Sequence, residues 1–134
     1  MIVPTFDLSG RTALITGASS GIGARWGQLM AAAGAKVVLC ARRVDQLEAL
    51  RDRIVADGGE ALAVAMDVAK EDSVVAGYEA AEGAFGLVDT VIANAGVSGE
   101  GLTEQQTVES FDDVLAINLR GVFRTGDDGR YWFR

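Results

Sequence analysis

Apolar residues occur along this chain in two alternating patterns. Stretches rich in apolar residues lie at 11–16, 36–41, 61–67 and 88–93, and the segments between them carry apolar residues three or four positions apart. A short run that is apolar on both faces is typical of a parallel strand covered by helices, and the wider spacing is typical of an amphipathic helix. The alternation predicts a single α/β domain, residues 1–134, with a doubly wound parallel sheet in a three-layer arrangement.

Four helices are predicted to follow these strands. The first spans residues 21–33 and ends at Gly34, and the second spans 44–56. The third is capped by Asp72 or Ser73 and ends between Gly83 and Gly86, and the fourth runs over 107–124 with Thr107 as its cap. The apolar positions of the first helix are Ile22, Trp26, Leu29, Met30 and Ala33, and those of the fourth are Phe111, Val114, Leu115 and Val122. An amphipathic helix turns such a stripe toward the core.

A glycine-rich turn joins the first strand to the first helix. Residues 16–23 read Thr-Gly-Ala-Ser-Ser-Gly-Ile-Gly, with glycines at Gly17, Gly21 and Gly23. Glycine permits positive φ and leaves no Cβ in the path of a ligand, and the N-terminus of a helix attracts phosphate. Ser19 and Ser20 add hydroxyl donors. The turn is a candidate phosphate site, and an ordinary helix start after glycine is the alternative.

Two arginines follow the second strand. In dinucleotide-binding folds an acidic residue about 20 positions beyond the glycines receives the ribose hydroxyls, whereas arginine there accommodates a 2′-phosphate. Here that position falls on Ala41, Arg42 and Arg43. The arginines favour NADP(H) over NAD(H) as cofactor, and the alternative is that both side chains are simply solvated.

Polar residues also end the third and fourth strands. Asp67 can accept a hydrogen bond from an adenine amino group, or it can cap the turn before Val68. Asn94, Ala95 and Gly96 end the fourth strand at the same edge of the sheet, where parallel sheets bind ligands, although Asn and Gly also suit a plain turn.

Asn118 is the polar member of the apolar stripe in the fourth helix. Its position predicts that the amide faces the interior, where an unpaired polar group costs about 1–3 kcal/mol. The amide either forms a structural interhelical bond or holds a water molecule or a catalytic side chain.

Composition and charge exclude several classes of function. The net charge of −7 argues against nucleic-acid and membrane partners, because both are anionic. The chain has no histidine, which argues against a metal site and a hydrolase triad, and its one cysteine, Cys40, lies in an apolar run typical of a buried strand. No signal peptide or membrane span is recognisable, so the expected location is cytoplasmic.

These motifs, in this order, resemble the short-chain dehydrogenase/reductase family. The resemblance runs from about residue 8 to residue 124 and rests on the glycine turn, Asp67-Val68, Asn94-Ala95-Gly96 and Asn118. It implies a Rossmann-type sheet of strand order 3-2-1-4, with the glycines and Ile22 at the pyrophosphate and Asp67-Val68 at the adenine. It also implies hydride transfer between a nicotinamide and a small carbonyl or alcohol substrate. Asn118 would be the asparagine of the family's Asn-Ser-Tyr-Lys tetrad.

The sequence departs from the family pattern in its last residues. The family's Tyr-xxx-Lys pair has no match, because Tyr78 is followed four positions later by Glu82 and Tyr131 has no residue at that offset. Residues 125–134 also break the apolar period of the preceding helix. We therefore expect a truncated, cofactor-binding part that is inactive alone, with truncation, a frame change and a cloning artefact left open as origins.

The functional alternative is a non-catalytic dinucleotide-binding module or a scaffold that binds nothing. Without further strands the fourth strand is an open edge, and part of its helix cover is missing. We expect the chain to form a homo-oligomer through the edge of strand 88–93 or through helix 107–124, because exposed apolar surface is commonly covered by another chain.

Overall fold

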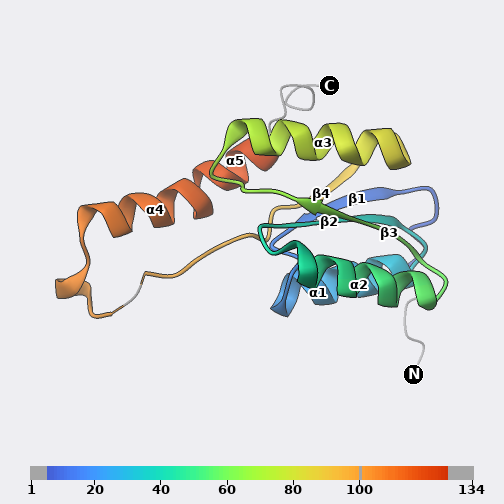
Figure 1. Ribbon diagram of the computed structural model, residues 1–134, viewed down its shortest axis with the longest axis horizontal. Coiled ribbons are helices and arrows are strands. Elements are labelled where there is room, and N and C mark those ends of the chain that lie inside the picture. The colour runs from blue at the N-terminus through green and yellow to red at the C-terminus, as the bar shows by residue number, and fades with distance from the viewer. Residues whose placement is uncertain (1–5, 100, 127–134) are drawn as a thin grey trace.

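The computed structural model describes residues 6–99 and 101–126 of the chain (Figure 1). Its elements, in order, are β1 (Thr12–Thr16), α1 (Gly21–Ala32), β2 (Lys36–Ala41), α2 (Val44–Ala56), β3 (Glu60–Ala65), α3 (Glu71–Phe85), β4 (Thr90–Ile92), a 3-10 turn (Thr103–Gln105), α4 (Val108–Asn118) and α5 (Arg120–Gly126). The sequence predicted an atypical tail at residues 125–134, and residues 127–134 of it lie outside the described part of the chain.

The four strands form one parallel sheet in the order β3-β2-β1-β4, which confirms the Rossmann-type prediction. Helices α1 and α2 cover one face, and α3 and α5 cover the other (Figure 1). The carboxyl ends of the strands therefore meet at one edge, where the polar turns follow them.

The core has one apolar layer on each side of the sheet. One layer joins β1 and β2 to α1 and α2 through side chains such as Ile15, Leu39 and Leu47. The other joins the opposite face of the sheet to α3 through Leu14, Val74 and Tyr78. This two-sided burial explains why the first two strands are apolar at successive positions.

Some element limits differ from the sequence-based expectation. The fourth strand is only Thr90–Ile92 rather than 88–93, and the third is Glu60–Ala65 rather than 61–67. Helix α3 begins at Glu71 and continues through Gly83 to Phe85. The Ser73 hydroxyl does not cap α3, because it accepts a hydrogen bond from the N–H of Asp67 instead (2.9 Å).

The buried face of α1 matches the predicted apolar stripe only at Met30, which is buried. Its buried residues are Gly23, Gly27, Met30 and Ala31, whereas Ile22 (71%), Trp26 (44%) and Leu29 (48%) are exposed. A Cβ on Gly27 would lie 2.6 Å from Cδ2 of Leu39, so α1 approaches the sheet more closely than a larger residue would allow. Gly23 and Gly27, together with Met30 and Ala31, therefore form the packed face of α1.

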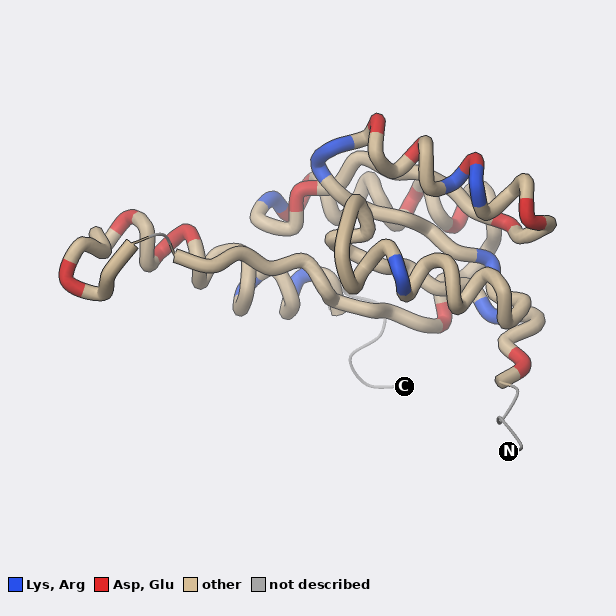
Figure 2. Tube along the Cα trace, turned by 90° about the horizontal axis from the view of Figure 1, so that it is seen from below, with Lys and Arg blue, Asp and Glu red and all other residues tan. Residues whose placement is uncertain are grey.

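The fourth helix was expected to be continuous over 107–124 and is broken at Leu119. Thr107 caps α4 as predicted, because its side chain accepts from the N–H of Ser110 (3.1 Å). No residue of α4 is buried, and Phe111 is 59% exposed, so the expectation of an interior stripe is wrong for α4. Figures 1 and 2 show α4 and the preceding loop projecting from the body of the molecule.

Cys40 is fully buried in β2, as the sequence predicted. Burial raises the pKa of its thiol to about 12, because the thiolate would lose its hydration. We expect Cys40 in the native chain to resist Ellman's reagent at pH 8 and to react at once in denaturant. Rapid reaction under native conditions would show that β2 is open to solvent.

Candidate functional site

The glycine turn brings the end of β1, the start of α1 and the end of β4 into close contact. Gly17 and Gly21 have φ of +67° and +57°, which side chains rarely adopt. A Cβ on Gly17 would lie 2.9 Å from both Nδ2 of Asn94 and Cα of Ala95. A Cβ on Gly23 would overlap the Gly17 carbonyl oxygen and lie 2.5 Å from Nδ2 of Asn94. Gly17 and Gly23 are therefore required by packing.

The N-terminus of α1 is open at this turn. Ser20 is the N-cap residue, and its side chain forms no capping hydrogen bond. The first turn of α1 contains no acidic residue, and a Cβ at Gly21 would point into open space. The positive end of the helix dipole and main-chain N–H groups are therefore available to an anion, and the residues present fit the pyrophosphate of a dinucleotide.

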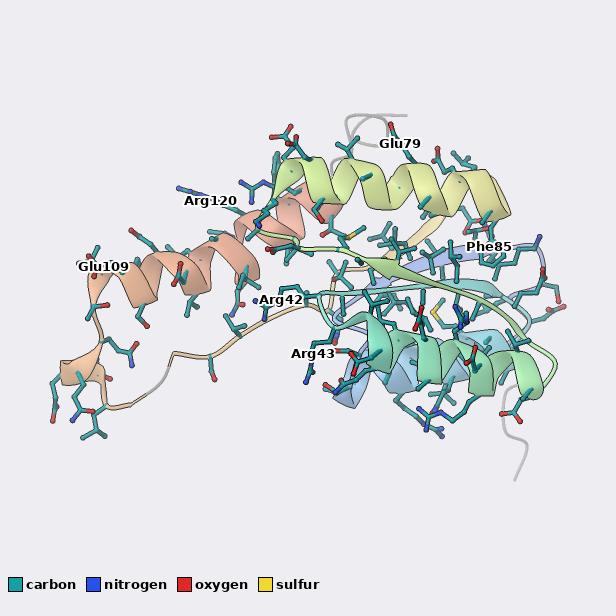
Figure 3. The ribbon with its side chains drawn as sticks, in the orientation of Figure 1. Arg42, Arg43, Glu79, Phe85, Glu109 and Arg120 are labelled. Carbon is teal, nitrogen blue, oxygen red and sulfur yellow. The ribbon has the colours of Figure 1, made fainter. Side chains whose placement is uncertain are left out.

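Arg43 reaches from the start of α2 to the glycine turn. Its Nη2 donates to Oγ of Ser19 (3.2 Å) and lies 3.5 Å from Oγ of Ser20. Both serine hydroxyls, expected as donors, accept from Arg43 here. Figure 3 shows Arg42 and Arg43 projecting beyond the carboxyl end of β2. Two cations therefore border the turn in a chain whose net charge is −7.

Asp67 follows β3 and organises its own turn. Its Oδ1 accepts from the N–H of Ala69 (3.0 Å), and its Oδ2 lies 4.0 Å from Nζ of Lys70. The turn-capping role is therefore present in the structure. An ionised carboxylate has further acceptor sites, so this role leaves room for a hydrogen bond to a ligand.

Asn94 connects the end of β4 to the end of β1. Its Nδ2 donates to the carbonyl oxygens of Thr16 (3.1 Å) and Gly17 (3.3 Å), while the N–H of Ala95 donates to Oγ1 of Thr16 (3.0 Å). These three bonds fix the two strand ends against each other. Asn94 therefore joins the end of β4 to Thr16 at the end of β1, in addition to ending its own strand.

Asn118 holds the loop that follows β4. Its Oδ1 accepts from the N–H of Val97 (2.8 Å), and its Nδ2 donates to the carbonyl of Val97 (2.7 Å). The residue is exposed at the end of α4, so the prediction of an interior amide is wrong. The break in the helix at Leu119 turns Asn118 toward main chain of a loop rather than toward another helix.

A cleft of about 310 Å³ lies where these elements meet. Of the predicted residues, it is lined by Gly17, Ser19, Ser20, Arg42, Arg43, Asp67, Val68, Asn94, Ala95 and Gly96. Gly21, Ile22, Gly23 and Asn118 do not line it. Ala41, which precedes the two arginines, lines it as well. Met66, Val97 and Ile117 complete the walls and were not predicted as site residues, because apolar wall residues carry no distinct sequence signal.

Over residues 6–99 and 101–126, no group of three or more metal-ligating side chains is present. Within the same residues no helix has the length and apolar character needed to cross a bilayer.

Comparison with known proteins places these features in a family. The family model described as short chain dehydrogenase matches residues 11–127. Gluconate 5-dehydrogenase of Gluconobacter oxydans is 36% identical over 121 residues, which cover 90% of this chain and 47% of that protein. The chain spans about half the length of the curated relatives that it matches.

Two solved structures are similar in fold and sequence. A metagenomic short-chain oxidoreductase in complex with NADP has a TM-score of 0.82 and 38% identity, over 89% of this chain and 54% of its own. A 3-ketoacyl-(acyl-carrier-protein) reductase from Brucella melitensis, complexed with NADH, has a TM-score of 0.84 and 40% identity. The match covers 90% of this chain and 49% of the reductase. The chain therefore belongs to the short-chain dehydrogenase/reductase family of oxidoreductases.

Proposed function

We propose that this chain binds NADP(H), in preference to NAD(H), in the cleft at the carboxyl edge of the sheet. The observation that carries the proposal is the open N-terminus of α1 beside two arginines, at a turn where Gly17 and Gly23 leave no room for side chains. One similar structure holds NADP and another holds NADH, so the preference rests on Arg42 and Arg43 of this chain.

Each part of the cleft suits one part of such a cofactor. The turn at Gly17, Ser19, Ser20, Gly21, Ile22 and Gly23 would hold the pyrophosphate, and Arg42 and Arg43 the 2′-phosphate. Asp67 and Val68 would receive the adenine, and Asn94, Ala95 and Gly96 would lie beside the remainder of the cofactor. Asn118 would act as a positioning residue, through its bonds to Val97.

The proposed reaction of the whole enzyme is hydride transfer between the nicotinamide and a small carbonyl or alcohol substrate. The bound cofactor supplies or accepts the hydride. Asn118 is the one tetrad residue that this sequence matches, so we expect the purified 134-residue chain to bind cofactor without turnover. A cytoplasmic location and self-association, through the edge of residues 88–93 or through helix 107–124, are also part of the proposal.

The alternative is a dinucleotide-binding or self-associating module with no catalytic role. Measured turnover of carbonyl substrates by the purified chain would exclude this alternative, whereas saturable NADPH binding without turnover would support it.

The test of the proposal is the affinity of the chain for the two reduced cofactors, measured by fluorescence titration. We expect Arg42→Asp to raise the Kd for NADPH about 10- to 100-fold, because a charge-assisted hydrogen bond contributes about 1.5–3 kcal/mol. The Kd for NADH should change much less, since NADH has no 2′-phosphate.

Arg53→Asp is the matched control, because it makes the same charge change in the last turn of α2, away from the cleft. Equal losses for NADPH and NADH in Arg42→Asp would contradict the phosphate assignment. If the folded wild-type chain bound neither cofactor, the site assignment would be wrong and the scaffold alternative would stand.

A further inference from the structure

Helix α5 lies beside α3 and directly behind the turn that joins β3 to α3 (Figure 1). Val68 in this turn is buried, at 6% exposure, and lines the cleft. A Cβ on Gly121 of α5 would lie 2.7 Å from Cγ2 of Val68, so the backbone of the helix closely approaches this side chain. The wall of the cleft at Val68 is therefore supported from behind by α5.

Arg124 extends from α5 to the main chain of the same turn. Its Nη1 donates to the carbonyl of Ala69 (3.1 Å) and lies 3.5 Å from the carbonyl oxygen of Val68. The neighbouring Thr125 is fully buried, and its carbonyl accepts from the Tyr78 hydroxyl, which fixes this part of α5 against α3. Arg124 itself is half-buried and does not line the cleft. Its guanidinium therefore acts on the turn and not on a ligand directly.

The peptide group between Val68 and Ala69 connects Arg124 to the carboxylate of Asp67. Its carbonyl oxygen is the one that lies 3.5 Å from Arg124, and its N–H donates to Oδ1 of Asp67 (3.0 Å). A trans peptide group is planar, with its C=O and N–H pointing in opposite directions, so a contact that holds the carbonyl also fixes the direction of the N–H. Hydrogen bonds linked in this way strengthen one another. Arg124 therefore orients the Asp67 carboxylate through one peptide group.

The other oxygen of the Asp67 carboxylate remains available to a ligand. Oδ2 lies 4.0 Å from Nζ of the exposed Lys70, which is beyond hydrogen-bond distance. The Asp67 side chain is 28% exposed and lines the cleft. An amino group of a ligand in the cleft would therefore meet Oδ2, while Oδ1 keeps its bond to the turn.

We propose that Arg124 is a positioning residue for the adenine of the cofactor, because it holds the Asp67 carboxylate in the orientation that accepts the adenine amino group. The inference rests on the proposed placement of the adenine at Asp67, and it adds the residue that sets the selectivity of that contact. A role in stability alone is the alternative. Arg124 lies in the last turn of α5, where a cation also offsets the helix dipole.

The test compares NADPH with its hypoxanthine analogue, in which a carbonyl oxygen replaces the adenine amino group. In fluorescence titration the wild-type chain should bind the analogue about 10-fold more weakly than NADPH, because the Asp67 carboxylate then faces an acceptor instead of a donor. Arg124→Met should lower this ratio of Kd values to about 2-fold or less, because the carboxylate is no longer oriented. Arg124→Lys can still donate to the carbonyl of Ala69 and should keep most of the wild-type ratio.

The ratio of Kd values distinguishes positioning from stability. Partial unfolding raises the apparent Kd for both ligands by the same factor, so a purely structural role leaves the ratio unchanged. The preference of Arg124→Met for NADPH over NADH should also stay at the wild-type value, since that preference is assigned to Arg42 and Arg43. The matched control is Arg120→Met, the same substitution at an exposed position of α5 (Figure 3), which should keep the wild-type ratio. Circular dichroism would show that each variant is folded.

The possible failures of the inference and of the proposed function give different results. If Arg124→Met kept the wild-type ratio, Arg124 would have a structural role alone and the cofactor site would stand. If the wild-type chain bound NADPH and the analogue equally, the adenine would not contact Asp67, and the inference would be wrong while the phosphate assignment stood. If the folded wild-type chain bound neither ligand, the proposed function would be wrong together with the inference.

Discussion

Replacing Gly23 by alanine is expected to abolish cofactor binding and to lower the free energy of unfolding by about 1–3 kcal/mol. The added Cβ would overlap the carbonyl oxygen of Gly17 and lie 2.5 Å from Nδ2 of Asn94, which are hydrogen-bonded to each other, and Nδ2 of Asn94 is also bonded to the carbonyl of Thr16. The start of α1 would therefore move away from the glycine turn and from the end of β4. Calorimetric titration with NADPH and urea denaturation measure the two effects.

Gly83→Ala is the matched control for Gly23→Ala. Gly83 lies inside α3, and a Cβ there would meet nothing within 4 Å. Alanine favours a helix over glycine by about 1 kcal/mol, so this variant should be slightly more stable and bind NADPH normally. If Gly23→Ala bound NADPH with wild-type affinity, the close approach of α1 to the turn would have no role in binding.

The order and type of the elements could be predicted because each short apolar run and each helical period is a local property of the chain. Helix α2, at Val44–Ala56, occupies the limits that its apolar period and the following Gly58 and Gly59 indicated. The cleft could be predicted for a similar reason. Its polar residues each follow a strand of a parallel sheet, and the carboxyl ends of those strands meet at one edge.

The packed face of α1 could not be predicted from hydrophobicity alone. Gly23 and Gly27 have no apolar side chain, so their sequence signal is weak, yet they allow the helix to approach the sheet. The larger residues Ile22 and Trp26 have a strong signal and lie on an exposed flank. The face of α1 that is buried is therefore set by how closely the helix can approach the sheet, and this depends on the side chains of the sheet as well as on those of the helix.

The environment of Asn118 depends on a contact that the sequence does not encode locally. A continuous helix over 107–124 would place this amide on one stripe with Phe111 and Val122. The break at Leu119 ends that stripe, and the partner of Asn118 is main chain at Val97, 21 positions earlier. Helical periodicity could not predict this contact, because it describes one element and not the loop beside it.

Tyr78→Ala is expected to lower the free energy of unfolding by about 3–5 kcal/mol, as for other large aromatic truncations. Tyr78 is among the largest fully buried side chains, at 1% exposure, and its hydroxyl donates to the main-chain carbonyl of Thr125 in α5. Against a typical total of about 5–15 kcal/mol, the loss should leave an appreciable unfolded fraction in mild urea. Urea denaturation followed by circular dichroism measures it.

The variant Tyr78→Phe distinguishes the contribution of the hydroxyl to stability from that of the ring. It keeps the core filled and leaves the Thr125 carbonyl without this donor, so we expect a loss of about 1–2 kcal/mol. Val75→Ala, on the exposed side of α3, should change stability by less than about 0.5 kcal/mol. Helix α5 begins two positions after Asn118, so loosening α5 should also loosen Asn118. We therefore expect Tyr78→Phe to speed hydrogen exchange at the N–H of Val97, which donates to Oδ1 of Asn118. If Tyr78→Phe cost as much as Tyr78→Ala, the hydroxyl bond to α5 rather than the buried ring would hold this side of the sheet together.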